Sequence, residues 1–505
     1  MTARECSVDL QKFALRLLVG LVSFALLAFS VEAAWAFLHA VDPVTGKALQ
    51  LSQLEVTPEM ARAVASPFAR AYNNIIALLL TFISLAIPLT ANLYTPKLIE
   101  IFIRDRLNLF VLCCCALLSA HSIFVVSLSF DNWTPQIPFW IDCAGAMFGW
   151  LMLMPYYFYV LSFIDPLTII KRIHLSLMVE LKAAAAGKYS VTEAQSRVNQ
   201  RIINLGSMLQ RSVDRADRDV AFDAIRAHTL DLARVREIKP RLSEAFFRIN
   251  SAHMFGMSSE AIEVLNHERI WMEYRIASQL VLAFKIALGK MPEAVSALVH
   301  AIKNAAHEEA CLKNDAVFRL LVRVFNTFTR EAIKTKENAP VYNVLYNYKT
   351  LIRRLLTDRP ELVPELIGYL SFYAEFARSQ GMVFIYELIS YELAELAEVA
   401  YAQRSKNADG LLDAMLALEG VARYAGLVKS RLIMVACLAE QGNEAAQARV
   451  MASLQVVPAE LLQRAQADIV KTEESTFWEI NHRGTNFDYV SVTRREIIRQ
   501  LALTA

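Results

Sequence analysis

The chain has 505 residues, of which 55% are hydrophobic, and its formal net charge is +2. Its mean hydropathy of +0.33 is higher than soluble proteins usually reach, which predicts a part that is embedded in a membrane. The near-neutral charge, without any block of basic residues, argues against nucleic acid as a partner.

The charged residues divide the chain into two parts. They are sparse up to about Ile170 and frequent from Lys171 onward. This step predicts a transmembrane domain over residues 1–172 and a water-soluble domain over residues 173–505. Seven cysteines are present, but no two form a C-x-x-C pair, so we expect no metal site, no redox motif and a reducing compartment.

Four apolar stretches in the first part reach the ~20 residues that a helix needs to cross a bilayer. The first stretch has two interpretations. Val31-Glu32-Ala33 resembles the cleavage site of a signal peptide, whereas the acidic residues before the stretch and the apolar residues after it favour an uncleaved helix. The predicted spans are residues 13–38, 74–95, 107–130 and 137–163.

The second predicted span carries a polar seam, whose members recur every three or four residues and therefore share one helix face. Unpaired polar groups are costly in hydrocarbon, so we expect the seam to face other helices or a wet cavity. Pro88 has no amide hydrogen to donate, which leaves the carbonyl of Ser84 unpaired on the same face. The seam comprises Asn74, Thr81, Ser84, Pro88, Asn92 and Thr95.

Two ionisable residues lie inside predicted spans, His121 in the third and Asp142 in the fourth. Counted at ~1.5 Å per residue from the turn between the spans, they reach a comparable depth. An ionisable residue in a membrane helix indicates a functional site by default. The alternatives are a His–Asp hydrogen bond that only fastens two helices, or an Asp142 close enough to the interface to be hydrated.

Basic residues predict the orientation of the spans. Apart from Lys47, Arg62 and Arg70 in the long first loop, they lie between the second and third spans and after the fourth span, which by the positive-inside rule places both termini in the cytoplasm. Three of them are expected at the level of the cytoplasmic headgroups, where they bind anionic lipid or pair with neighbouring acidic residues. These three are Lys97, Arg104 and Arg106. The chain is thus predicted to be a multi-pass protein of the inner membrane.

The segment after the seam resembles that of a known protein family. It consists of Tyr94-Thr95-Pro96-Lys97-Leu98, then Phe102-Ile103-Arg104-Asp105-Arg106, and directly afterwards the third apolar span. This order is similar to that in a family of uncharacterised bacterial inner-membrane proteins with four N-terminal membrane helices and a cytoplasmic domain. The resemblance covers residues 73–126. The family's later loop motif, which ends in Asn-Asp-Pro, is missing at Ala287–Pro292. Because the family has no established activity, the resemblance implies a topology and no activity.

The second part has a helical pattern almost throughout. Ile385, Ile389 and Leu393 recur on one helix face, while Glu392 occupies another. Ser190-Val191-Thr192-Glu193 has the pattern of a capping box at a helix start. Glycine and proline interrupt the pattern at fairly regular intervals, and no sustained two-residue alternation occurs. We therefore expect an all-α protein whose cytoplasmic domain contains roughly ten to twelve helices in repeat-like pairs.

Catalytic motifs are scarce. The chain has no glycine-rich phosphate loop, no G-x-S-x-G and no H-E-x-x-H, so we expect neither an enzyme nor a bound cofactor. His300 and His307 share a helix face but lack a third ligand at metal spacing, which argues against a metal site. The aromatic stretch over residues 477–489 is expected to pack onto its own domain, with docking of a partner as the alternative.

These features favour a membrane-anchored interaction or sensory protein that acts on a cytoplasmic protein partner through its helical domain. The alternative is an ion channel or transporter in which the polar face of the second span lines the pathway. Four membrane helices are few for a monomeric transporter, so the alternative requires a homo-oligomer. In both hypotheses the lipid bilayer is a partner.

Overall fold

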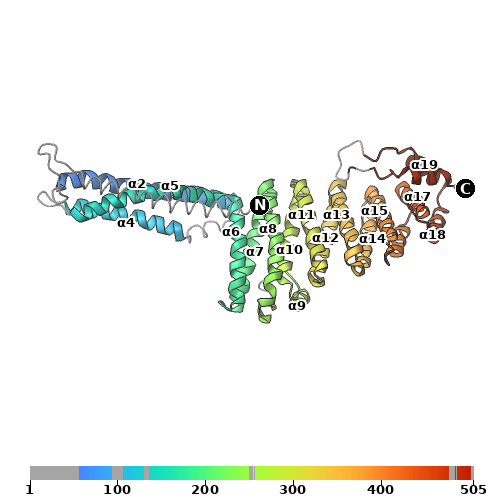
Figure 1. Ribbon diagram of the computed structural model, residues 1–505, viewed down its shortest axis with the longest axis horizontal. Helices are drawn as coiled ribbons and strands as arrows, with labels where there is room; N and C mark the ends of the chain where they lie inside the picture. Colours follow the sequence, from blue (N-terminus) through green and yellow to red (C-terminus); the bar gives the residue numbers. More distant parts are fainter. Residues whose placement is uncertain are drawn as a thin grey trace. The chain divides into compact units, whose positions relative to one another are not determined.

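The protein is built of helices (Figure 1). The computed structural model contains eighteen α-helices and no strand within its described residues, which confirms the all-α prediction. The chain divides into two compact units, Met1–Ile169 and Ile170–Ala505. The structure describes residues 56–93, 106–129, 136–249, 254, 256–476, 484 and 486–501.

Three long helices are described in the first unit, and each contacts the other two. Leu107–Leu128 and Gln136–Ser162 are two stretches long and apolar enough to cross a membrane. The predicted first span lies outside the described residues. The three helices are α2 (Pro58–Leu93), α4 (Arg106–Leu128) and α5 (Gln136–Ile164).

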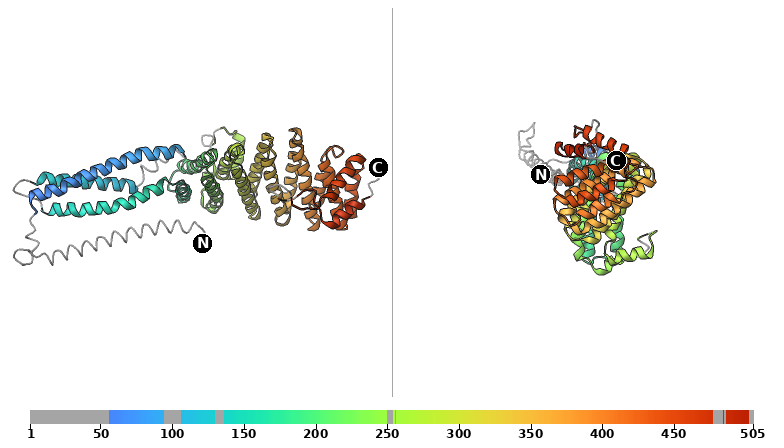
Figure 2. Two further views of the ribbon diagram at one scale, coloured as in Figure 1. Left: turned by 90° about the horizontal axis from the view of Figure 1, so that it is seen from above. Right: turned by 90° about the vertical axis from the view of Figure 1, so that its right-hand side faces the viewer.

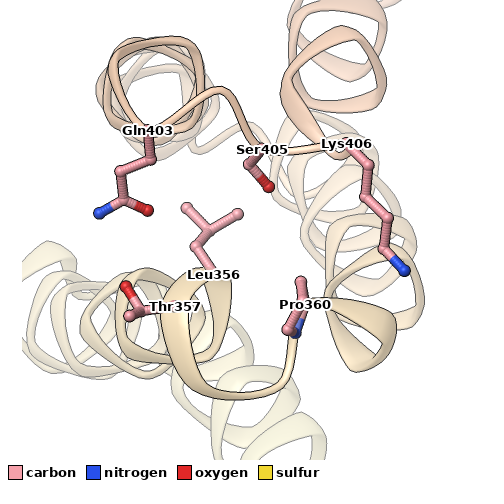
Figure 3. Close-up of a pocket in the computed structure, with 6 residues that line it drawn as sticks. All are labelled: Leu356, Thr357, Pro360, Gln403, Ser405 and Lys406. Atoms are coloured by element: carbon pink, nitrogen blue, oxygen red, sulfur yellow. The ribbon is translucent and has the colours of Figure 1, made fainter.

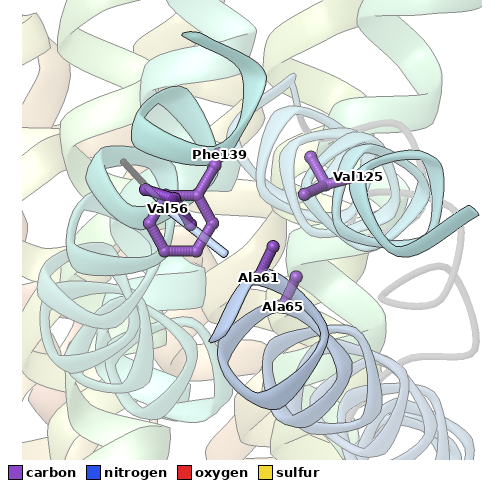
Figure 4. Close-up of a cluster of buried hydrophobic side chains, with 5 residues drawn as sticks. All are labelled: Val56, Ala61, Ala65, Val125 and Phe139. Carbon is purple, nitrogen blue, oxygen red and sulfur yellow. The ribbon is translucent and has the colours of Figure 1, made fainter. Parts of the chain in front are cut away.

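Helix α2 begins well before the predicted second span. Thr57 caps its start, because the Thr57 hydroxyl accepts the Met60 amide hydrogen at 3.2 Å. The following residues, which the sequence analysis had not assigned to a membrane helix, continue the same helix without a break. Their small side chains explain this: Ala61 and Ala65 are fully buried in a cluster with Val125 and Phe139 of the neighbouring helices (Figure 4).

Two hydrogen bonds fix the antiparallel register of α2 and α4. The Arg62 Nε donates to the Ser129 carbonyl at 2.8 Å, at the C-terminal end of α4. The Ser119 hydroxyl donates to Asn73 Oδ1 at 2.8 Å, near the middle of α4. The polar seam, which starts at Asn74, is therefore level with the middle of α4 and extends toward the N-terminal end of that helix.

The second unit is an array of helix pairs. Helices that alternate along the chain form two rows, and each helix contacts the next one in its row. One row consists of α7, α10, α12, α14 and α16, and the other of α8, α11, α13, α15 and α17. Within this unit the helices stand side by side in chain order, from green to red, in both Figure 1 and Figure 2.

The helices of this unit have the following bounds: α6 (Pro166–Ala185, at the boundary), α7 (Val191–Asp214), α8 (Arg218–Ile238), α9 (Ser259–His267), α10 (Trp271–Lys290), α11 (Pro292–Cys311), α12 (Asp315–Thr335), α13 (Asn338–Asp358), α14 (Val363–Ser379), α15 (Val383–Ala402), α16 (Ala408–Leu416), α17 (Ala425–Glu440), α18 (Glu444–Leu454), α19 (Ala459–Lys471) and α20 (Val492–Gln500). Three short 3-10 helices, Lys239–Arg241, Glu244–Phe247 and Pro360–Leu362, stand between them.

Buried apolar side chains within and between the rows form the core. Phe284 of α10 and Phe328 of α12 stack with ring centroids 3.9 Å apart. The predicted stripe of α15 is buried, with Ile385, Ile389 and Leu393 at 0% exposure. At the start of α7 the Ser190 hydroxyl accepts the Glu193 amide hydrogen at 3.3 Å, as the capping pattern predicted.

The described part of the C-terminal aromatic stretch packs onto its own unit. The ring of Phe487 lies 6.1 Å from that of Tyr342 and 5.4 Å from that of Tyr391. The carboxylate of Asp488 accepts hydrogen bonds from the Tyr391 hydroxyl at 2.8 Å and from Lys429 Nζ at 2.7 Å. These contacts tie the stretch to α13, α15 and α17.

Candidate functional site

The polar seam lies on the surface of the first unit. The side chains of Asn74, Thr81 and Ser84 are exposed, so α4 and α5 do not cover them. The Thr81 hydroxyl donates to the Ala77 carbonyl at 2.8 Å, which satisfies its donor within the helix. The opposite face of α2, with Ile75, packs against the core formed by α4 and α5.

The remaining members of the predicted sites are only partly described. Pro88 and Asn92 belong to helix α2, and Arg106 is the first residue of α4. Thr95, Lys97 and Arg104 lie outside the described residues.

The exposed polar face of α2 is longer than the sequence analysis predicted. Arg70 is exposed one helical turn before Asn74, and its Nη2 donates to the Ser66 hydroxyl at 2.9 Å. With these two residues the face gains a cation at its N-terminal end. Sequence reasoning missed them because they precede the apolar run that defined the second span.

His121 and Asp142 do not form the hydrogen bond that was considered. The Ser122 hydroxyl donates to Asp142 Oδ1 at 2.6 Å, whereas His121 Nε2 lies 3.1 Å from the Pro138 carbonyl oxygen. Asp142 is only 2% exposed, which contradicts the interpretation of a hydrated side chain within the unit. Its Oδ2 has no hydrogen-bond partner in the described part of the chain.

A tyrosine that the sequence analysis did not single out fastens α2 to α5. The Tyr72 hydroxyl lies 3.2 Å from the Gly145 carbonyl oxygen and 3.1 Å from that of Ala146. A β-carbon on Gly149 would lie 2.5 Å from the same hydroxyl. Gly149 is therefore needed for this close approach of the two helices. The spacing of Gly145 and Gly149 in the sequence permits close packing, but it does not indicate the partner helix.

In the second unit, charged side chains lie between helices of the α8–α17 row. Lys349 of α13 is 5% exposed and sits 2.8 Å from a carboxylate oxygen of Glu392 and 2.7 Å from one of Glu395, both on α15. The sequence pattern predicts Glu392 on a face other than the apolar stripe, yet the residue is only 1% exposed. A cation from the neighbouring helix compensates for this burial.

A second buried polar group joins α6 and α8. His174 Nδ1 lies 2.5 Å from Asp231 Oδ1. Burial raises the pKa of Asp231, and the hydrogen bond from His174 opposes that shift. One turn earlier on α8, complete burial lowers the pKa of His228 to about 3. Neither ring nitrogen of His228 has a hydrogen-bond partner among the described residues, so the imidazole is held neutral.

A shallow hollow of about 410 Å³ lies where the end of α13 meets the α15–α16 turn (Figure 3). Leu356 and Pro360 form its apolar wall, and the side chains of Gln403 and Lys406 stand at its rim. Its lining also includes Thr357 and Ser405, and it contains no nucleophile–base pair.

No protein-family model, no curated protein and no solved structure matches the chain.

Proposed function

We propose that the protein is a membrane-anchored interaction protein whose helical unit binds another protein in the cytoplasm. In this proposal residues 1–172 form four membrane helices with both termini in the cytoplasm of the cell, and the chain has no catalytic activity. The length and apolar composition of α4 and α5 support the anchor. The resemblance to the bacterial inner-membrane family supports the same topology.

The observation that carries the proposal is the arrangement of the second unit. Its helices contact their neighbours in two parallel rows. An array of this kind offers long continuous surfaces instead of an enclosed cavity, and such surfaces suit protein partners. Ion pairs such as that of Lys349 join neighbouring helices within one row and leave the outer faces of the array available to a partner.

Apolar side chains of α14 and of the start of α15 are our candidate contacts for the partner. Phe372 is 54% exposed, Phe384 45% and Val383 39%. The rings of Phe372 and Phe376 are stacked, with centroids 6.5 Å apart. We call these four residues the aromatic face. Exposed apolar surface of this kind is typical of protein-binding sites, because a partner removes it from water.

Photo-crosslinking in cells tests the proposal. A photoreactive phenylalanine analogue replaces Phe372 or Phe384 in the full chain, and the matched control carries it at Val264, an exposed residue of α9. The proposal predicts a crosslinked product of one defined mass at both positions of the aromatic face and not at the control. The same products at all three positions, or none at Phe372 and Phe384, would contradict it.

A second candidate function is an oligomeric channel, and the exposed polar face of α2 favours it. Polar side chains that α4 and α5 leave uncovered are unfavourable against lipid, so copies of α2 that face a shared wet path would relieve this cost. The test is ion flux in proteoliposomes with Thr81, Ser84 and Asn92 all replaced by leucine. A control replaces the exposed Leu78 with phenylalanine. Flux that is the same in both variants would remove this candidate.

A further inference from the structure

The structure brings together three metal-ligating side chains that the sequence separates. Cys311 follows His307 by four residues on α11, so both project from one face near the end of that helix. Asp358 is the last residue of α13, the neighbouring helix in the same row. One ligand atom from each of the three residues lies within 4.8 Å of the other two.

We propose that His307, Cys311 and Asp358 bind a zinc-class divalent metal ion. The three residues offer an imidazole nitrogen, a thiolate sulfur and a carboxylate oxygen. This is the ligand chemistry of Zn²⁺, whereas Mg²⁺ and Ca²⁺ prefer oxygen atoms alone. Three protein ligands leave a fourth tetrahedral position for a water molecule, and the exposure of Cys311 and Asp358 gives solvent access to it.

The distances fit a tetrahedral ion. Zn–S and Zn–N bonds of about 2.3 Å and 2.0–2.1 Å give a sulfur-to-nitrogen separation of about 3.6 Å across a tetrahedral angle. Cys311 Sγ lies 3.7 Å from His307 Nε2. The same nitrogen atom lies 2.7 Å from Asp358 Oδ2, so it faces both other ligands at once. A metal ion would take the place of the hydrogen bond and move the carboxylate outward by about 0.6 Å.

The residue after Asp358 holds the two helix ends together. Arg359 donates from Nη1 to the Ala310 carbonyl at 2.5 Å and from Nη2 to Asp315 Oδ1 at 3.0 Å. These bonds link the end of α13 to the end of α11 and to the start of α12. Arg359 is thus a positioning residue, because it sets the distance between Asp358 and the two ligands on α11.

Neighbouring side chains that could compete for the metal ion interact with other residues. Arg236 of α8 binds the carboxylates of both Glu308 and Glu309. His300, which shares a face with His307 in the sequence, has its Nδ1 3.2 Å from the Nζ of Lys303 and so faces a cation. The sequence argues against a metal site at His300 and His307, because a third ligand is missing. In the fold, His307 instead lies beside Cys311 and Asp358.

Cobalt binding tests the site, since Co²⁺ bound to a thiolate gives a charge-transfer band that nitrogen and oxygen ligands do not produce. The full chain is purified in detergent without a histidine tag, stripped with EDTA and titrated with Co²⁺, then with Zn²⁺. We expect one equivalent of Co²⁺ to produce the band and Zn²⁺ to displace it, while Mg²⁺ has no effect. A wild-type chain without the band overturns the proposal.

Three ligand variants and one control locate the ion. Cys311→Ser should abolish the band, and His307→Gln and Asp358→Asn should weaken Zn²⁺ binding by at least about 10-fold. His300→Gln should bind like the wild type. Far-UV circular dichroism verifies that each variant is folded. Folded Cys311→Ser that keeps the band, or His300→Gln that loses it, would contradict the assignment.

Discussion

The buried imidazole of His228 makes a measurable prediction about stability and pH. Burial lowers its pKa to about 3 in the folded protein, from an ordinary value of 6.5. Below the ordinary pKa, the unfolded chain binds a proton that the folded chain does not bind. The free energy of unfolding should therefore fall as the pH falls, by about 1.4 kcal/mol between neutral pH and about pH 5.5.

Replacing His228 with leucine isolates this contribution. Leucine has no titratable group and fills a similar volume. The free energy of unfolding of the variant should therefore fall by about 1.4 kcal/mol less than that of the wild type over the same pH range. The raised pKa of Asp231 acts in the opposite direction, because at low pH the folded chain then binds a proton that the unfolded chain does not bind. This contribution is the same in both proteins and cancels in the comparison. Urea unfolding of the full chain in detergent, followed by circular dichroism at the two pH values, measures the difference. Parallel pH profiles for wild type and His228→Leu would refute the reasoning.

Three further substitutions test the packing. Lys349→Met should destabilise the second unit by about 3–5 kcal/mol in urea unfolding, because two carboxylates of α15 lose their cation. The control Arg353→Met should cost less than about 1 kcal/mol, because the ion pair of Arg353 is more exposed. Gly206→Ala should lower the free energy of unfolding by about 1–3 kcal/mol, since the new β-carbon would lie 2.2 Å from a glutamine side chain of α10. The control Gly289→Ala has open space around it and should be neutral or stabilising. Gly149→Ala should displace the tyrosine of α2 and lower the thermal midpoint in detergent; an unchanged midpoint would contradict the close contact.

The helical class and the buried stripes could be predicted from the sequence because they depend on local periodicity. Ile385 and Ile389 recur at helical spacing, and both are fully buried. The number of helices was underestimated, since short helices such as α9 and α16 resemble loops in a pattern analysis. The helix start at Pro58 was indicated by the Thr57 cap, but its continuation into the second span was missed, because Ala61 and Ala65 are not strongly apolar although their small size permits close packing.

Contacts between helices could not be predicted, because they depend on register and not on spacing. The sequence indicated that Asn74, Thr81 and Ser84 share a face, but not that α4 and α5 pack against the opposite one. It likewise contained the His307–Cys311 pair, whereas Asp358 comes from a helix that only the fold brings close.

The most direct test of the central claim is the affinity of the crosslinked partner, once purified, for the full chain in nanodiscs. We expect that replacing both Phe372 and Phe384 with serine weakens binding by at least about 10-fold, because two exposed aromatic anchors are lost. The control, Val264→Ser, should bind like the wild type. Equal affinity of all three proteins would contradict the claim that the aromatic face of the helical unit binds the partner.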